Sequence, residues 1–292
     1  MGSFCAATAT AVAGFQASHG LAASGTCDET TWSALVEASW KLGDRLLFLT
    51  SPNLRGEDVA DLQGSLARLG FDCGRVDGIL GPQTARALSD FQSNCGVLSD
   101  GVCGIGTVQT LRRLSSQTGH GPGVAAVREQ ERVRSLGSLA ACRVVVGQFG
   151  GLSSLTRWIG RELRLRNAVV MSLDEPEPVA QAVAANHFGA DVYVGFESSP
   201  TPSAVSCFYR VPTFESSGGR ALADAVSERL AALEAFGQLS AHASGLRLPV
   251  LRETRMPAVL CVLGPVRPVV DHIAEIGAAV IDALEVWTSP AG

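Results

Sequence analysis

The chain has 292 residues, of which 46% are hydrophobic and 17% are charged, and its formal net charge is −5. This length favours about two domains, and the composition is typical of a globular protein and excludes a largely disordered one. Nucleic-acid binding needs clustered Lys and Arg, and no such cluster interleaved with aromatic residues is present, so we expect no nucleic-acid partner. No apolar run reaches the roughly 18 residues of a membrane span, so no transmembrane helix is expected.

The N-terminal 25 residues are rich in alanine but do not resemble a signal peptide. The first Lys or Arg is Lys41, so the positively charged start of a signal peptide is missing. We therefore expect a cytoplasmic protein. The eight cysteines contain no C-x-x-C pair and are expected to be buried small hydrophobes. A disulfide or metal role for Cys73, Cys95 and Cys103 is the less favoured alternative.

An internal duplication organises the N-terminal half. Phe15-Gln16 recurs as Phe91-Gln92, 76 residues further along the chain. Six more identities keep this offset without a gap: Thr8/Thr84, Gly20/Gly96, Gly25/Gly101, Cys27/Cys103, Thr31/Thr107 and Leu35/Leu111. A constant spacing indicates two copies of one unit, predicted over residues 1–42 and 52–116. The first copy lacks a counterpart of the second copy's opening helix, which predicts either an extension upstream or a different docking of this copy.

The second copy predicts three helices separated by glycine turns. Apolar residues recur at helical spacing between residues 59 and 69, again after Pro82, and again over residues 107–114. The turns between them carry Asp77-Gly78 and Asp100-Gly101, residue types that favour tight turns. A compact three-helix unit is therefore expected.

Residues 55–114 resemble the bacterial peptidoglycan-binding domain. Three motifs carry the resemblance in order: L-Q-x-x-L-x-x-L-G, V-D-G-x-x-G-x-x-T and F-Q-x-x-x-G-x-x-x-D-G. The resemblance implies that peptidoglycan or one of its precursors is the ligand. The candidate ligand-binding residues are those of the motifs: Asp77, Gly78, Gly81, Thr84, Phe91, Gln92, Asp100 and Gly101. The alternative, favoured for most of them, is that they only maintain the fold.

A change of pattern follows the repeats. Residues 117–140 are predicted to be a linker, glycine-rich at first and then a short, charged, solvated helix. Over residues 141–288 strands alternate with helices. The predicted strands cover residues 144–146, 168–173, 191–196, 204–209 and 258–263, and the predicted helices 155–165, 178–188, 220–236 and 269–287. This alternation predicts an α/β domain with a mainly parallel sheet.

The stretch Arg252–Gly264, R-E-T-R-M-P-A-V-L-C-V-L-G, resembles the last motif of the zinc-dependent N-acetylmuramoyl-L-alanine amidases. In that family this strand carries a catalytic glutamate, and Val262 stands at its position. The resemblance places the three zinc ligands at Phe149, at Leu152 or a neighbouring serine, and at Glu197. A lone carboxylate does not hold zinc at useful affinity. The domain is therefore expected to be a degenerate amidase with no catalytic residue and no cofactor.

The replacement of the zinc ligands and of the catalytic glutamate leads to two further expectations. Phe149, Phe196, Val262 and Leu263 are expected to line an apolar pocket. Glu197 is expected to pair there with Arg252 or Arg255, because desolvation would otherwise raise its pKa.

A metal site, a serine nucleophile and a phosphate-binding loop are only weakly indicated elsewhere in the domain. His187, His242 and His272 do not pair at metal spacing and are read as surface or capping residues. Ser198-Ser199 lacks a G-x-S-x-G elbow, and Gly218-Gly219 lacks the lysine of a phosphate-binding loop.

The order of the parts resembles the actinobacterial CwlM family, as do E-A-S-W-K-L-G at residues 37–43 and R-E-x-E-x-V-R-S at residues 128–135. The resemblance implies a cytoplasmic pseudo-amidase that regulates peptidoglycan precursor synthesis, with UDP-N-acetylglucosamine carboxyvinyltransferase as a partner. It also implies control by a phosphorylated threonine in a C-terminal tail, for which Thr288 is the candidate remnant. Two alternatives stay open: an active zinc-dependent amidase that hydrolyses peptidoglycan, and a plain peptidoglycan-binding module.

Overall fold

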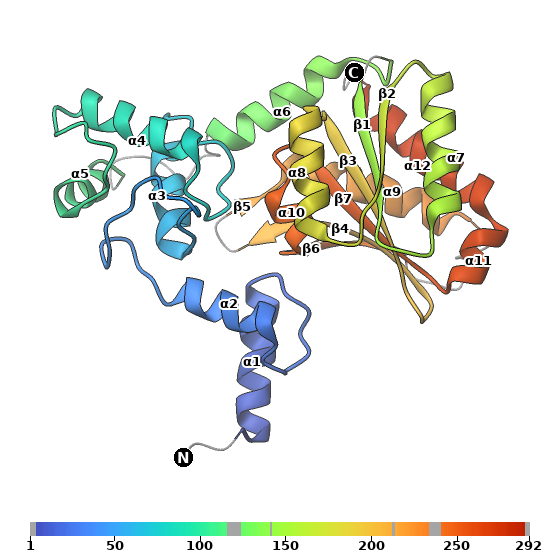
Figure 1. Cartoon of the computed structure of the whole chain (residues 1–292), viewed down its shortest axis with the longest axis horizontal. Coiled ribbons are helices and arrows are strands. Elements are labelled where there is room, and N and C mark those ends of the chain that lie inside the picture. The colour runs from blue at the N-terminus through green and yellow to red at the C-terminus, as the bar shows by residue number, and fades with distance from the viewer. Residues whose placement is uncertain (1–3, 116–123, 141, 212–213, 234–240, 290–292) are drawn as a thin grey trace. The chain divides into compact units, whose positions relative to one another are not determined.

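The computed structural model describes residues 4–115, 124–140, 142–211, 214–233 and 241–289 (Figure 1). The chain forms two compact units, residues 1–128 with 212–214 and residues 129–211 with 215–292. The first is built from helices and the second is an α/β domain, so the predicted fold class is confirmed. The glycine-rich part of the predicted linker, residues 117–123, lies outside the described residues, and its charged part forms α6 (Val124–Leu136).

The second copy of the repeat has the three predicted helices, α3 (Glu57–Arg68), α4 (Pro82–Asn94) and α5 (Ile105–Ser115). Their apolar faces enclose one core, whose fully buried side chains include Leu62, Leu66, Leu88, Phe91 and Leu111. The first copy contributes α1 (Ala6–Ser18) and α2 (Glu29–Ala38), the counterparts of α4 and α5. Asp28 begins α2 by accepting a hydrogen bond from the Thr31 backbone N–H at 2.7 Å.

A buried glutamine fixes the turn between α4 and α5. The Gln92 amide nitrogen donates to Asp100 Oδ1 at 3.0 Å, to the Val102 carbonyl at 3.0 Å and to Thr107 Oγ1 at 3.2 Å. Its amide oxygen accepts from the Gly101 N–H at 2.9 Å. One side chain therefore joins its own helix, the Asp-Gly turn and the next helix.

The same arrangement, called the glutamine clip below, occurs two more times. In the first copy Gln16 bonds to Thr31 Oγ1 and accepts from the Gly25 N–H. Between α3 and α4, Gln63 bonds to Thr84 Oγ1 and accepts from the Gly78 N–H. The offset of 76 residues relates the clip of Gln16 to the clip of Gln92. The structure thus supports the duplication and shows that the clip itself recurs within one repeat.

Within the described residues, the second unit contains a seven-stranded sheet. The strands are β1 (Arg143–Gln148), β2 (Val169–Asp174), β3 (Val192–Ser198), β4 (Ser203–Val211), β5 (Phe214–Glu215), β6 (His242–Leu246) and β7 (Ala258–Gly264). Their order is β2-β1-β3-β7-β4-β5, with β6 beside β4. β2, β1, β3 and β7 are parallel, and β4 runs antiparallel to β7. All five predicted strands are present, while β5 and β6 were not predicted.

Helices cover both faces of the sheet (Figure 1). On one face lie α7 (Ser153–Leu165), α9 (Ser217–Ala231), α11 (Val266–Asp271) and α12 (Ile273–Thr288). The other face carries α8 (Pro178–Phe188) and α10 (Pro249–Glu253). The prediction of one helix over residues 269–287 is wrong, because His272 leaves the helical conformation and separates α11 from α12. Among the described residues no helix is long and apolar enough to cross a membrane.

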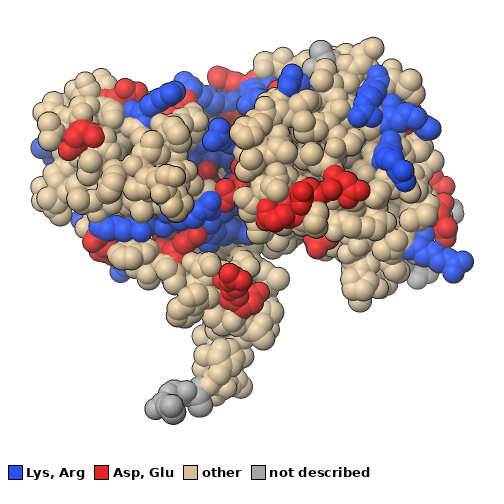
Figure 2. All heavy atoms as spheres, viewed as in Figure 1, with Lys and Arg blue, Asp and Glu red and all other residues tan. Residues whose placement is uncertain are grey.

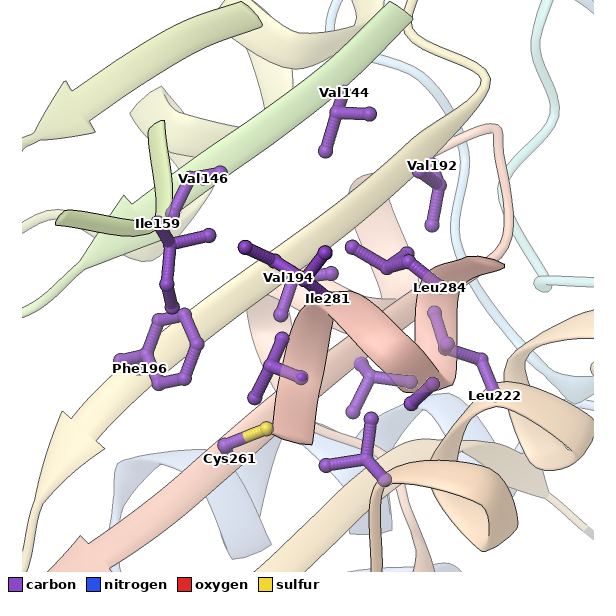
Figure 3. Close-up of a cluster of buried hydrophobic side chains, with 14 of the residues drawn as sticks. Val144, Val146, Ile159, Val192, Val194, Phe196, Leu222, Cys261, Ile281 and Leu284 are labelled. Atoms are coloured by element: carbon purple, nitrogen blue, oxygen red, sulfur yellow. The ribbon is translucent and has the colours of Figure 1, made fainter. Parts of the chain in front are cut away.

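The main core lies between the sheet and the first group of helices (Figure 3). Alternate residues of the central strands, such as Val144, Val194 and Cys261, point to this side. α7 contributes Leu155, Ile159 and Leu163, four residues apart and so on one helix face. The α8 helix is defined at both ends, by the Glu177 carboxylate at its first N–H groups and by Gly189 in a left-handed conformation after its last turn.

Candidate functional site

The candidate site lies at the edge of the sheet where β1, β3 and β7 end side by side. From β1 the chain goes to β2 on one side, and it then returns to β3 on the other side of β1. The edge between β1 and β3 is therefore a switch point of the strand order, the usual place of ligand sites in open α/β sheets. The loop after β1 and the last residue of β3 meet there: a Cβ on Gly151 would lie 3.4 Å from Ser198 Oγ.

The four positions predicted to correspond to a zinc centre all lie at or near this edge. Phe149 continues β1 and donates its backbone N–H to the Phe196 carbonyl at 3.1 Å. Leu152 directly precedes α7 and is only 1% exposed. Glu197 and Val262 are register partners on β3 and β7. The four residues that the resemblance assigns to the zinc centre therefore lie in one region of the fold.

The expected apolar pocket is not formed, and this prediction is wrong. Side chains alternate along a strand, so Phe196 and Leu263 point to one face of the sheet and Val262 to the other. Phe196 is fully buried in the main core, where it lies beside Ile159 (Figure 3). Phe196 is therefore a core residue and not part of a cleft.

The expected ion pair of Glu197 is also absent, and this prediction is wrong as well. Glu197 is exposed to solvent and forms no ion pair among the described residues. Arg252 lies in α10 and Arg255 follows it, before the start of β7, whereas Glu197 pairs with Val262 near the end of that strand. Four residues of a strand span about 13 Å, so neither arginine belongs to this edge.

Gln148, which was not singled out from the sequence, organises the loop after β1. Its side chain is 2% exposed, and its amide oxygen accepts from the backbone N–H groups of Gly150 at 2.7 Å and Leu152 at 3.3 Å. Its amide nitrogen donates to Ser153 Oγ at 3.2 Å and to the Asp174 carboxylate. A polar residue at the end of a valine strand was the signal that could have identified it. These hydrogen bonds hold the loop in one conformation, and no metal ion is needed for this.

A second buried network supports this loop from the opposite face of the sheet. Tyr193 donates its hydroxyl to Gln181 Oε1 at 2.7 Å, and Gln181 Nε2 donates to the Gln148 carbonyl at 2.8 Å. Room for these side chains comes from Gly147, where a Cβ would lie 2.1 Å from Gln181 Oε1 and 2.7 Å from Tyr193 Oη. The end of β1 is therefore fixed by polar contacts on both sides.

The weaker candidates have other surroundings. His187 is exposed near the end of α8, His242 begins β6 rather than lying in a loop, and His272 Nδ1 donates to the Pro268 carbonyl at 2.9 Å. Across the described ranges, no group of three or more His, Cys, Asp or Glu side chains could hold a metal ion. These three histidines are therefore not brought together.

The N-terminus of α9, whose first turn holds Gly218 and Gly219, binds a carboxylate of the chain itself. Glu129 of α6 accepts from Ser216 Oγ at 2.6 Å, from Ser217 Oγ at 3.3 Å and from the Gly218 N–H at 3.5 Å. A carboxylate at a helix N-terminus is electrostatically favourable. The place where a phosphate loop would bind its ligand is thus filled by Glu129.

The candidate ligand-binding residues of the second repeat take part mainly in its internal contacts. Thr84, Phe91 and Gln92 are buried, and Asp77 Oδ1 accepts from Gln63 in its glutamine clip. Asp100 is exposed, but its carboxylate accepts from Gln92 and from the Val102 N–H. Gly78 and Gly101 adopt positive φ in the turns, and Gly81 precedes Pro82 at the start of α4. This placement favours the reading that most of them maintain the fold.

All eight cysteines are free thiols. Five are buried as expected: Cys73, Cys103, Cys142, Cys207 and Cys261. For Cys5 and Cys27 the expectation is wrong because both are exposed, and Cys95 is half-buried. Burial raises the pKa of each of the five buried thiols to about 12, since a thiolate would lose its hydration.

These pKa values predict protection from thiol reagents near neutral pH. Cys5 should react fastest, because it is exposed and a hydrogen bond with Thr8 lowers its pKa. Cys27 should follow, and the five buried thiols should react only in denaturant, as mass spectrometry of the labelled chain would show.

The same pKa values predict how stability depends on pH. In the unfolded chain the thiols ionise near 9.0, so the free energy of unfolding should be unaffected below that pH and should fall as the pH rises toward about 12. Rapid labelling of Cys261 in the native protein would contradict the described core.

Comparison with known proteins identifies the chain. Residues 1–35 and 55–111 match the family model of the putative peptidoglycan binding domain. The N-acetylmuramoyl-L-alanine amidase CwlM of Mycobacterium tuberculosis is 33% identical over 290 residues, which cover 87% of this chain and 70% of that protein. The chain belongs to the CwlM family. It therefore combines a peptidoglycan-binding domain with an amidase-like domain.

Other relatives of this CwlM-family chain match smaller parts. A spore cortex-lytic enzyme of Bacillus cereus is 46% identical over 56 residues, 19% of this chain and 22% of the enzyme. The N-acetylmuramoyl-L-alanine amidase CwlA of Bacillus subtilis is 37% identical over 78 residues, 25% of this chain and 29% of the amidase. Among solved structures, the amidase Ami1 of Mycobacterium smegmatis superposes with a TM-score of 0.43 and 12% identity, over 52% of this chain and 98% of Ami1.

The residues at the predicted zinc centre do not fit zinc. The ion needs nitrogen, sulfur or carboxylate donors at three protein positions. Phe149, Leu152 and Val262 carry hydrocarbon side chains, and Glu197 is the single carboxylate of the four. The nearest polar network, around Gln148, uses its donors and acceptors on the loop itself. We therefore assign no step to a metal at this edge.

Proposed function

We propose that this member of the CwlM family is a non-catalytic pseudo-amidase that regulates the synthesis of peptidoglycan precursors. The observation that carries the proposal is the set of side chains at the carboxyl edge of the sheet. Amide hydrolysis needs an activated water and a base within hydrogen-bond reach. Phe149, Leu152 and Val262 offer neither a metal ligand nor a base.

The intact scaffold around these positions supports a binding role. Gln148, Gln181 and Tyr193 form a buried, fully bonded network that holds the loop after β1 in place. A buried polar network of this kind is costly when it is incomplete, so it fixes one shape of the surface. The proposal is that this surface and the peptidoglycan-binding repeats recognise partners in the cytoplasm.

The partner proposed from the family resemblance is UDP-N-acetylglucosamine carboxyvinyltransferase. The test is the initial rate of enolpyruvyl transfer by that enzyme, with and without the purified full chain, alongside binding of the chain to insoluble peptidoglycan. We expect a change in the enzyme's rate at concentrations where the two proteins bind. Binding to insoluble peptidoglycan with no effect on the enzyme would instead identify a plain wall-binding module and would contradict the proposal.

Hydrolysis of peptidoglycan is the second candidate, since the Mycobacterium tuberculosis relative carries the name of an amidase. It requires a bound metal and a water that the four positions named above do not provide.

A further inference from the structure

The outer face of α7 carries a row of arginines that the proposed function does not use. Arg157, Arg161 and Arg164 are exposed and stand four and three residues apart, so they share one face of the helix. At 1.5 Å per residue the row is about 10 Å long. Figure 2 shows basic side chains gathered over this helix, which is labelled α7 in Figure 1. We call these three residues the arginine row.

Little of this positive charge is compensated by the residues that the structure describes. α7 contains one carboxylate, Glu162, which lies 3.1 Å from Arg161 and is shared with Arg166. Arg157 donates to the Ser153 carbonyl and Arg164 to the Val170 carbonyl, both at 3.2 Å, and within the described residues neither forms an ion pair. The whole chain has a net charge of −5, so the row is a local excess of positive charge on an acidic protein.

The row is not explained by the stability of the fold. The opposite face of α7 holds Leu155, Ile159 and Leu163 in the main core, and this burial already fixes the helix. Exposed arginines with carbonyl contacts contribute little to stability. Three neighbouring cations instead repel one another, so they favour an anionic partner.

We propose that the arginine row docks this protein on the surface of an anionic phospholipid bilayer. Charge complementarity indicates an anionic partner, and guanidinium groups bind phosphate oxygens through paired hydrogen bonds. The same face carries Leu165, which is 70% exposed and can enter the headgroup region. A protein partner fits the row less well, because the buried centre of a protein interface is apolar and this face offers one large apolar side chain, Leu165.

The test is cosedimentation of the full chain with vesicles of phosphatidylglycerol and phosphatidylcholine, compared with vesicles of phosphatidylcholine alone. Binding should require the anionic lipid and weaken with added salt. Each of R157Q, R161Q and R164Q should lower the partition coefficient about fivefold, and the triple variant should abolish binding. Circular dichroism should show the same helix content in every variant, since the substituted side chains are exposed.

The matched control is R220Q, which removes one positive charge from α9, where Arg220 is paired with Glu215 at 2.9 Å. It should bind vesicles as the parent chain does. An equal loss in R220Q would show that only net charge matters, and parent-like binding by the triple variant would show that the row is not the contact; either result overturns the proposal. Absence of binding to the anionic vesicles, with or without binding to an acidic polypeptide such as polyglutamate, also overturns it.

Discussion

Replacing Gln92 by leucine should destabilise the second repeat by about 3 kcal/mol. The two side chains are similar in size, but leucine cannot form the four hydrogen bonds of the glutamine clip. The hydroxyl of Thr107 and the N–H of Gly101 would lose their partner in a largely buried turn, and an unpaired buried group costs more than the bond itself contributed. Urea unfolding of the full chain and hydrogen exchange at Gly101 would measure the effect.

The matched control is Gln109→Leu, the same change on the exposed face of α5. It should alter the free energy of unfolding by less than about 0.5 kcal/mol. If Gln92 bound a ligand rather than stabilising the fold, the Gln92→Leu variant would be as stable as the parent chain but would bind peptidoglycan fragments more weakly. That outcome would reverse the structural reading of the motif residues.

Gly264→Ala should destabilise the α/β unit by about 3 kcal/mol. Gly264 ends β7, and a Cβ there would lie 2.3 Å from the Ser199 carbonyl oxygen and 2.7 Å from that of Thr201. Both atoms belong to the backbone that leads from β3 to β4, so a side-chain rotation cannot relieve the overlap. The connection would have to move away from the sheet edge where the candidate site lies. Thermal unfolding of the variant would measure the loss.

Gly106→Ala provides the comparison for this substitution. Gly106 lies within α5, and apart from its chain neighbours and the backbone of its own helix no atom approaches the position of its Cβ within 4 Å. Alanine should be neutral there or stabilise the helix by up to about 1 kcal/mol. Equal stability of Gly264→Ala and Gly106→Ala would mean that the connection is not packed against the end of β7 as described.

The fold class was predictable because its signals are local. Valine-rich strands alternate with amphipathic helices in the second unit, and glycine turns separate short helices in the first. β6 was missed because His-Ala-Ser-Gly-Leu has no apolar run, and its pairing with β4 depends on residues distant in sequence. The break at His272 was missed because apolar residues continue through it with helical spacing.

The geometry of the candidate site was less predictable. A motif resemblance assigns residues to positions, but the face to which a strand residue points depends on register. For this reason Phe196 and Val262, both assigned to one cleft, lie on opposite faces of the sheet. The role of Gln148 depends on Asp174, which is brought to it by the pairing of β1 with β2. That contact could not be read from either segment alone.

We propose that this amidase-like domain lacks amidase chemistry, and its zinc content measured together with hydrolysis of peptidoglycan decides the question. The purified full chain, incubated with zinc and then desalted, should hold no stoichiometric zinc and should release no muropeptides from peptidoglycan. Val262→Glu should behave in the same way, because it restores one carboxylate beside Glu197 while Phe149 and Leu152 still offer no ligand. One zinc ion per chain together with release of muropeptides by the parent protein would show instead that the domain is an active zinc-dependent amidase.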